Sequence, residues 1–161
     1  MSTISIQSCE WKQYPKNMNN KLHTLCSYMA MFPPSVPHYF IDKYSDEGTI
    51  VLDPFSGRGT TVLEASFMNR IGIGNDKNPL AYLLTKAKSS VPQIKRILSR
   101  IEKIEREFNP NLISIKNEEK KIRMIFSDYT LKQLVFLKNK LNWRRSNVDS
   151  FIAAMVLGIM H

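Results

Sequence analysis

The sequence predicts an α/β fold in which a βαβ unit with parallel strands is followed by a mainly helical segment, so that the sheet is incomplete. Two short apolar runs, residues 49–52 and 71–74, favour strands, and each is soon followed by an aspartate. After residue 90 no strand signal rivals the helical periodicity. We expect three portions: an N-terminal arm at 1–20, the βαβ portion at 21–90 and a helical portion at 91–161.

The segment before the first strand combines a polar arm with two expected helices. Residues 1–20 are polar and lack a clear period. Residues 21–31 place apolar side chains at helical spacing, and Pro33-Pro34 then prevents a helix from continuing. Residues 35–44 form a second amphipathic pattern, which a polar turn at 45–48 ends.

The βαβ unit follows that turn. Residues 49–52 are β-branched and apolar, as expected for a strand buried on both faces of a parallel sheet. Residues 60–69 return to helical composition, and residues 71–76 form the second strand. Asn78-Pro79 then opens a helix through residue 88.

The rest of the chain is expected to be helical. Residues 91–108 carry a stripe of isoleucines and one leucine along one helical face, whereas residues 147–161 are apolar and capped near Asn147. A further amphipathic helix is expected at 129–141, with loops at 109–111 and 117–121.

Composition points to a folded, basic protein. The 161 residues are 43% hydrophobic and 23% charged, which suits one globular domain with a core. The 23 Lys and Arg against 14 Asp and Glu give a formal charge of +9. This charge favours a polyanionic partner such as nucleic acid, and a solvated basic surface is the alternative.

Cysteine usage and hydropathy bear on location. Cys9 and Cys26 have no paired metal-ligand spacing, and nothing in the N-terminus resembles a signal peptide, so we expect a reducing, cytoplasmic protein with no metal. The longest apolar run near the C-terminus, residues 151–160, is shorter than the roughly 20 residues that a helix needs to span a bilayer. No membrane segment is expected.

The turn after the first strand has the chemistry of a ligand site. Gly57 and Gly59 let the backbone approach a ligand, and the helix that starts near Thr60 presents N–H groups to an anion. Asp53 at the strand's tip disfavours a phosphate and suits a ligand with an amino group beside its carboxylate. Asp76, after the second strand, is placed to accept hydrogen bonds from ribose hydroxyls.

The nonapeptide Asp-Pro-Phe-Ser-Gly-Arg-Gly-Thr-Thr at residues 53–61 resembles the cofactor motif of the DNA amino-methyltransferases, which methylate adenine N6 or cytosine N4. Arg58 departs from the small residue usual there. His23 and Phe32-Pro33-Pro34 are similar to the segment that wraps the methionine end of the cofactor in that family. The resemblance runs from about residue 21 to residue 88.

This resemblance implies a partial Rossmann-like methyltransferase fold that binds S-adenosyl-L-methionine. It places Asp53 at the methionine amino group, the turn at 56–61 at its carboxylate and Asp76 at the ribose. The exocyclic amine of an extruded base would attack the methyl group directly. The expected cofactor-binding residues are Asp53, Pro54, Phe55, Ser56, Gly57, Gly59, Thr60, Thr61, Asp76 and Phe32.

The same family holds its target amino group with a short loop of Asp, Asn or Ser followed by Pro-Pro and an aromatic residue. No such tetrapeptide occurs in this sequence, and the catalytic residues are therefore unknown. Two predicted strands alone make a marginal sheet, and the apolar run ends at His161 without a polar tail. We expect a truncated chain or a subunit, with the loop in a second polypeptide or a missing C-terminal part and with DNA as substrate.

Several alternatives remain open at this stage. The Gly-Arg-Gly turn can be a tight connection without a ligand, Asp76 a helix cap, Phe32 packing against the sheet edge and His23 a surface or capping residue. Basic residues beyond residue 90, among them Lys95 and Arg96, can contact phosphates or form a solvated face.

Other functions remain open as well. The chain can be a non-catalytic cofactor- or DNA-binding subunit that acts with a partner. An RNA or small-molecule methyltransferase, or a nicotinamide-binding unit, is a weaker alternative, and the full three-glycine dinucleotide fingerprint is lacking. The target base, the recognition sequence and any cognate restriction enzyme are not encoded in these motifs.

Overall fold

The computed structural model describes residues 10–15, 20–29 and 31–160. The chain divides into two compact units. The first contains the described residues up to Ser90 together with those from Ala154 onward, and the second contains Val91–Ala153. The division of function among three portions stays a prediction.

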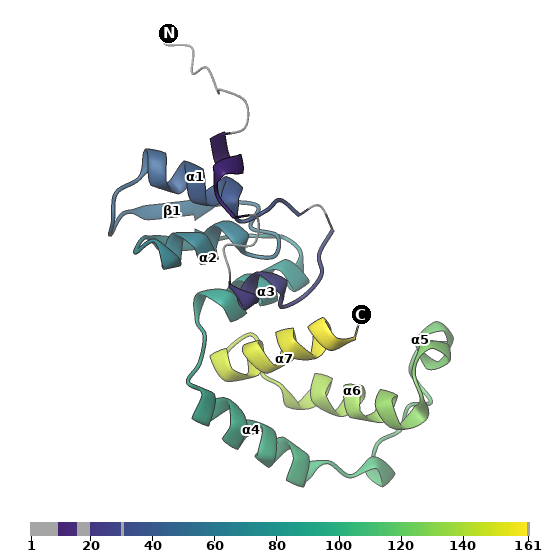
Figure 1. The fold of residues 1–161 in the computed structure, drawn as a ribbon. Helices are drawn as coiled ribbons and strands as arrows, with labels where there is room; N and C mark the ends of the chain where they lie inside the picture. Colours follow the sequence, from purple (N-terminus) through teal and green to yellow (C-terminus); the bar gives the residue numbers. More distant parts are fainter. Residues whose placement is uncertain (1–9, 16–19, 30, 161) are drawn as a thin grey trace. The chain divides into compact units, whose positions relative to one another are not determined.

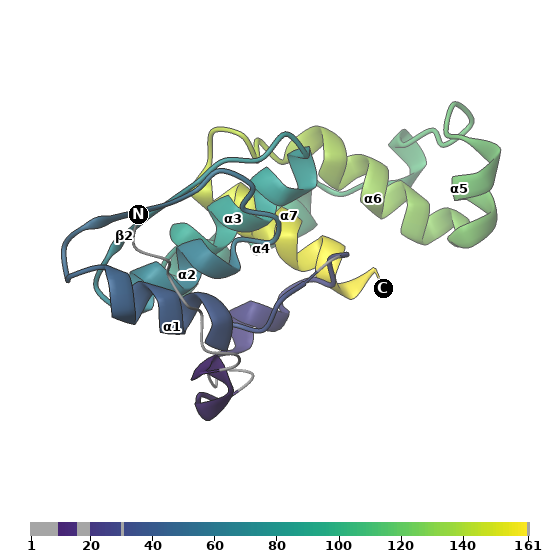
Figure 2. The ribbon, with the colours of Figure 1, turned by 90° about the horizontal axis from the view of Figure 1, so that it is seen from above.

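The first unit contains the two strands and the helices around them (Figures 1 and 2). Its elements are the 3-10 turns η1 (Glu10–Gln13) and η2 (Lys21–Thr24), α1 (Ser35–Tyr44), β1 (Ile50–Asp53), α2 (Thr60–Phe67), β2 (Ile71–Gly74) and α3 (Pro79–Ser89).

Strands β1 and β2 are parallel neighbours, with Ile50 opposite Ile71 and Asp53 opposite Gly74. Helix α2 connects them, packs on both strands, and is flanked by α1 and α3. A Cβ atom at position 72 would lie 2.6 Å from the carbonyl oxygen of Val62, so glycine there lets α2 approach the sheet closely. The predicted α/β fold with a parallel βαβ unit and a two-stranded, incomplete sheet is confirmed.

One face of this sheet is not covered by the residues that the structure describes. Ile50, Leu52, Ile71 and Ile73 are 64%, 63%, 55% and 44% exposed, whereas the alternate residues face the helices and are half-buried. The prediction that the first strand is buried on both faces is therefore wrong. The helices α1, α2 and α3 supply only one covering layer.

The helices of this unit match the sequence patterns with one exception. Helix α1 has the predicted bounds, and Asn78 caps α3 by accepting a hydrogen bond from the backbone N–H of Leu80 at 2.9 Å. The predicted helix over residues 21–31 is wrong, because among the described residues of this segment only Lys21–Thr24 are helical, and they form a 3-10 turn. His23 and Cys26 are nevertheless buried, so this segment packs against the rest of the unit without forming the expected helix.

The second unit is helical in its described elements. It contains α4 (Ile94–Glu107), the 3-10 turn η3 (Pro110–Leu112), α5 (Lys120–Ile125), α6 (Asp128–Lys140) and the first residues of α7 (Asn147–Ile159). Phe108 at the end of α4 packs edge-on against Tyr129 and Phe136 of α6, with ring centroids 5.9 and 5.4 Å apart. The mainly helical second half is confirmed.

Two expected loops are partly helical. The turn η3 occupies most of the loop predicted at 109–111, and α5 begins at Lys120 within the loop predicted at 117–121. In α6, the side chain of Ser127 accepts a hydrogen bond from the backbone N–H of Thr130 and so caps the helix. None of the described helices is both long enough and apolar enough to cross a membrane.

Candidate functional site

The predicted turn lies where β1 and β2 end side by side. Asp53 closes β1 and accepts a hydrogen bond through Oδ1 from the backbone N–H of Phe55 at 3.1 Å. The backbone N–H of Asn75 donates to the carbonyl oxygen of Asp53, and that of Ser56 donates to the carbonyl oxygen of Asn75, each at 2.9 Å. The two loops that follow the strands are therefore joined by backbone hydrogen bonds, and ligands of open parallel sheets bind beyond such strand ends.

Asp76 joins the second loop to the glycine turn. Its Oδ2 accepts from the backbone N–H of Gly57 at 2.9 Å, and its Oδ1 accepts from that of Asn78 at 2.8 Å. The cap of α3 is Asn78, so the alternative in which Asp76 caps this helix is wrong. The sequence-predicted residues Asp53, Gly57 and Asp76 are thus brought together.

The turn at 57–59 requires glycine. Gly57 and Gly59 have φ angles of 51° and 77°, in the left-handed region that side chains with a Cβ rarely adopt. A Cβ atom at position 59 would also lie 2.8 Å from the Cα of Thr85. Helix α2 then begins at Thr60 without a side-chain cap, so the positive end of its dipole and its first N–H groups are suited to an anion.

Helix α3 supports this turn from behind. Ser56 Oγ and Thr85 Oγ1 are hydrogen-bonded at 3.0 Å, and the ammonium of Lys88 donates to the carbonyl oxygen of Arg58 at 2.7 Å. Lys88 is 3% exposed. Burial, together with the nearby charge of Arg58, lowers the pKa of Lys88 from 10.5 to about 8, and the Cys26 thiol opposes this shift.

Sequence reasoning missed Thr85 and Lys88. A usable signal was present, because Ala81, Thr85 and Lys88 follow one another at i, i+4 and i+7 on the buried face of α3. A lysine on the apolar face of a short helix indicates a buried partner, which here is the backbone of the turn.

The other predicted residues differ in exposure. Phe55 is 86% exposed and Phe32 is 45% exposed, so both can meet a ligand or a further part of the protein. Ser56 and Thr60 are buried, Thr61 is half-buried and Pro54 is exposed. A pocket of about 250 Å³ at β2 and α3 is lined by Ser56 and Asp76 among others.

His23 has a different environment from the one expected. The surface or capping role is wrong, because His23 is 2% exposed and its Nε2 lies 2.6 Å from Oε1 of the buried Glu64. The Nδ1 of His38 lies 2.9 Å from Oε2 of the same carboxylate. Glu64 therefore joins η2 and α1 to α2. Among the residues that the structure describes, no cluster of His, Cys, Asp and Glu is suited to a metal.

A family model described as DNA methylase, that of the N6/N4 methyltransferases, matches residues 6–87. The chain belongs to this DNA methylase family. The match contains the βαβ unit, the glycine turn and the His23 segment, and most of α3.

Similar proteins support the DNA methylase assignment. The chain is 28% identical over 142 residues to the type II methyltransferase M.MjaII of Methanocaldococcus jannaschii, covering 84% of this chain and 26% of the relative. It is 29% identical to the type II methyltransferase M.BsoBI of Geobacillus stearothermophilus, covering 60% of this chain and 21% of the relative. Over 51 residues it is 45% identical to the type II methyltransferase M.HindIII of Haemophilus influenzae, covering 32% of this chain and 16% of the relative.

The chain spans about a quarter or less of the length of these three DNA methylase relatives. No solved structure matches the chain significantly. The match with M.MjaII is longer than the family-model match, so similarity to a type II methyltransferase extends beyond the βαβ unit.

Proposed function

We propose that this chain is the S-adenosyl-L-methionine-binding portion of a DNA methyltransferase acting on adenine N6 or cytosine N4. The observation that carries the proposal is the meeting of Asp53, Gly57 and Asp76 at the carboxyl ends of two parallel strands, in a member of the DNA methylase family. The βαβ portion at 21–90 binds the cofactor in this proposal, and the helical portion at 91–161 contacts DNA.

The residues present suit the charges of this cofactor. The uncapped start of α2 offers N–H groups to a carboxylate, and the half-buried carboxylate of Asp53 suits a primary amine. Each carboxylate oxygen of Asp76 accepts one hydrogen bond, from the backbone of Gly57 or Asn78. Each oxygen has a further lone pair that can accept from a ribose hydroxyl.

Each residue then has a binding or orienting task. Asp53 orients the amino group, the backbone from Ser56 to Thr61 holds the carboxylate, and Asp76 holds the ribose. Phe55 and Phe32 exclude water, together with Pro54. When bound, S-adenosyl-L-methionine supplies a methyl group attached to a positively charged sulfur.

Groups that hold the target base are proposed to come from a second polypeptide or from a C-terminal part beyond residue 161. The open face of the sheet supports this, because four apolar side chains at Ile50, Leu52, Ile71 and Ile73 suit coverage by further structure. The free, buried thiol of Cys26 fits the proposed reducing, cytoplasmic location.

A non-catalytic subunit that binds cofactor or DNA beside a catalytic partner is the second candidate. The same open sheet face favours it. Methyl transfer to duplex DNA, assayed with the chain together with a polypeptide that carries the missing loop, separates the candidates, since only the first requires that this activity be lost in the Asp53→Ala variant.

Asp53→Ala tests the cofactor site. A charge-assisted hydrogen bond contributes about 1.5–3 kcal/mol, so we expect the variant to bind S-adenosyl-L-methionine about ten- to a hundredfold more weakly in calorimetric titration. Asp42→Ala, which removes an exposed carboxylate from α1, is the matched control and should leave the dissociation constant unchanged. Equal affinity of the Asp53→Ala variant and the wild type would contradict the assignment.

A further inference from the structure

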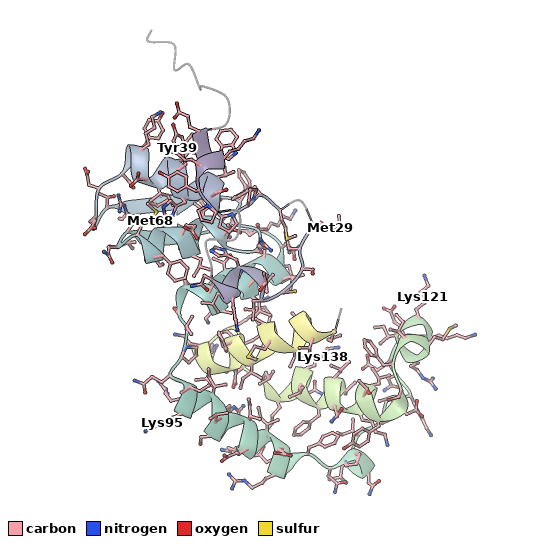
Figure 3. The ribbon with its side chains drawn as sticks, in the orientation of Figure 1. Met29, Tyr39, Met68, Lys95, Lys121 and Lys138 are labelled. Atoms are coloured by element: carbon pink, nitrogen blue, oxygen red, sulfur yellow. The ribbon has the colours of Figure 1, made fainter. Side chains whose placement is uncertain are left out.

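A basic groove lies within the second unit, between the N-terminal two-thirds of α4 and the start of α7. Its volume is about 600 Å³. The side chains that give it its character are Lys95, Arg96, Ser99, Arg100, Lys103 and Ser146. Figure 3 labels Lys95 near the first turn of α4.

The cations occupy one face of α4. Lys95, Ser99 and Lys103 are spaced at i, i+4 and i+8, and Arg96 and Arg100 stand beside them at i and i+4. The apolar stripe of this helix, which includes Ile97 and Ile104, faces the other way around the helix.

One of these cations is neutralised by the protein. Arg100 donates from Nε to Oδ1 of Asp149 at 2.8 Å and from Nη2 to Oδ2 at 3.3 Å. Asp149 Oδ2 also accepts from the backbone N–H of Asn142, and Arg100 Nη2 donates to the carbonyl oxygen of Lys140. The one carboxylate of the groove is therefore already engaged, and it holds Arg100 in place.

The remaining cations of the groove differ from Arg100 in this respect. In the part of the chain that the structure describes, no salt bridge engages Lys95, Arg96 or Lys103. Lys103 also attracts Glu107, whose pKa is lowered chiefly by its hydrogen bond with Lys140. Three cations and two serine hydroxyls thus border a groove whose carboxylate is already paired.

We propose that this groove binds the phosphate backbone of duplex DNA. Lys95 and Lys103 are separated by eight residues, which is about 12 Å along a helix and enough to reach more than one phosphate, since the charges of one strand advance roughly 3.4 Å each along the DNA axis. Ile94, Leu98 and Ile101 are exposed on the opposite face of α4, so an anionic lipid surface is the competing partner, and the test includes it. The inference rests on the proposed function for its choice of DNA.

The test measures binding of the full chain to a fluorescently labelled DNA duplex by anisotropy over a series of salt concentrations. The triple variant Lys95→Ala, Arg96→Ala, Lys103→Ala should bind at least tenfold more weakly at about 0.1 M salt. Its slope of log affinity against log salt should fall by about 0.9 for each lost phosphate contact, or nearly 3 in all.

The matched control removes two lysines and one arginine elsewhere in the same unit, on α5. Lys120→Ala, Lys121→Ala, Arg123→Ala changes the net charge equally, and Lys121 is labelled in Figure 3. This variant should lose less than about threefold in affinity. Equal losses in the two triple variants, an unchanged groove variant, or a wild type that binds no duplex would overturn the proposal.

Three further measurements make each outcome decisive. If circular dichroism shows that the triple alanine variant is misfolded, a variant with glutamine at the same three positions is tested instead, since glutamine also favours a helix. Groove-dependent binding to vesicles of phosphatidylserine and phosphatidylcholine, without duplex binding, would also overturn the proposal. Titration with S-adenosyl-L-methionine should give the wild-type affinity for the groove variant, which distinguishes failure of this inference from failure of the proposed cofactor site.

Discussion

Lys88 carries its charge in a place that disfavours it. The side chain is almost fully buried, and it donates to the carbonyl oxygen of Arg58 within the turn. The neutral amine keeps N–H groups that can make the same hydrogen bond. Lys88 therefore fixes the turn in either protonation state, while the charged state lowers the stability of the fold.

This arrangement predicts how stability depends on pH. Burial lowers the folded-state pKa of Lys88 to about 8, below the unfolded value of 10.5, so the unfolded state binds more protons between pH 8 and 10.5. The free energy of unfolding contributed by Lys88 should then rise with pH through this window. We expect the free energy of unfolding of the wild type minus that of Lys88→Met, measured by urea denaturation, to increase from pH 7.5 to pH 10.

The exposed Lys77→Met change supplies the baseline for the loss of one positive charge. Its difference from wild type should change less over the same range than that of Lys88→Met. A pH-independent difference for Lys88→Met would show that the ammonium is hydrated in the native state.

At the scale of elements, Glu64 connects three segments. Its two carboxylate oxygens meet His23 of η2 and His38 of α1, and Glu64 itself is 1% exposed on α2. Glu64→Ala would leave both imidazoles without this partner, and we expect a loss of about 3 kcal/mol in the free energy of unfolding.

Urea denaturation of Glu64→Ala beside Glu47→Ala measures this effect. Glu47 is exposed in the turn before β1, and its removal should change stability by less than about 0.5 kcal/mol. Equal stabilities for the two variants would mean that the histidines find other partners and that Glu64 does not join the elements.

The elements also show which parts of the fold the sequence could predict. Helices α1 and α3 follow from local signals, namely Pro33-Pro34 before α1 and the Asn78-Pro79 pair that caps and opens α3. The structure of segment 21–31 could not be predicted from local signals, because burial of His23 beside Glu64 depends on a residue 41 positions away. Non-local contacts of this kind have no signature in a window of ten residues.

The candidate site divides in the same way. The glycine turn and both aspartates are visible in the sequence, since a strand, two glycines and a helix follow each other directly. The hydrogen bond between Gly57 and Asp76, and the support from Lys88, depend on how α3 returns to the turn. Sequence patterns place residues on elements, whereas tertiary packing decides which of them meet.

At the scale of the whole molecule, the main feature is the sheet face that the described residues leave uncovered. Ile50 and Leu52 on β1 lie opposite Ile71 and Ile73 on β2, so the four side chains form one apolar patch. The apolar runs in the sequence could not show this, because exposure of a strand depends on which other segments cover it. If the patch is covered only by a partner or a further part of the protein, it contributes little to the stability of the chain alone.

A pair of identical substitutions tests this argument. Leu52 is 63% exposed on the open face, whereas Leu63 on α2 is 2% exposed. In urea denaturation of the chain alone, Leu63→Ala should lower the free energy of unfolding by about 2–5 kcal/mol, because it leaves a cavity. Leu52→Ala should cost less than about 1 kcal/mol, since little buried area is lost and only strand propensity changes. Similar costs at the two positions would show that the chain covers this face by itself, and the sheet would then give no support to a second polypeptide.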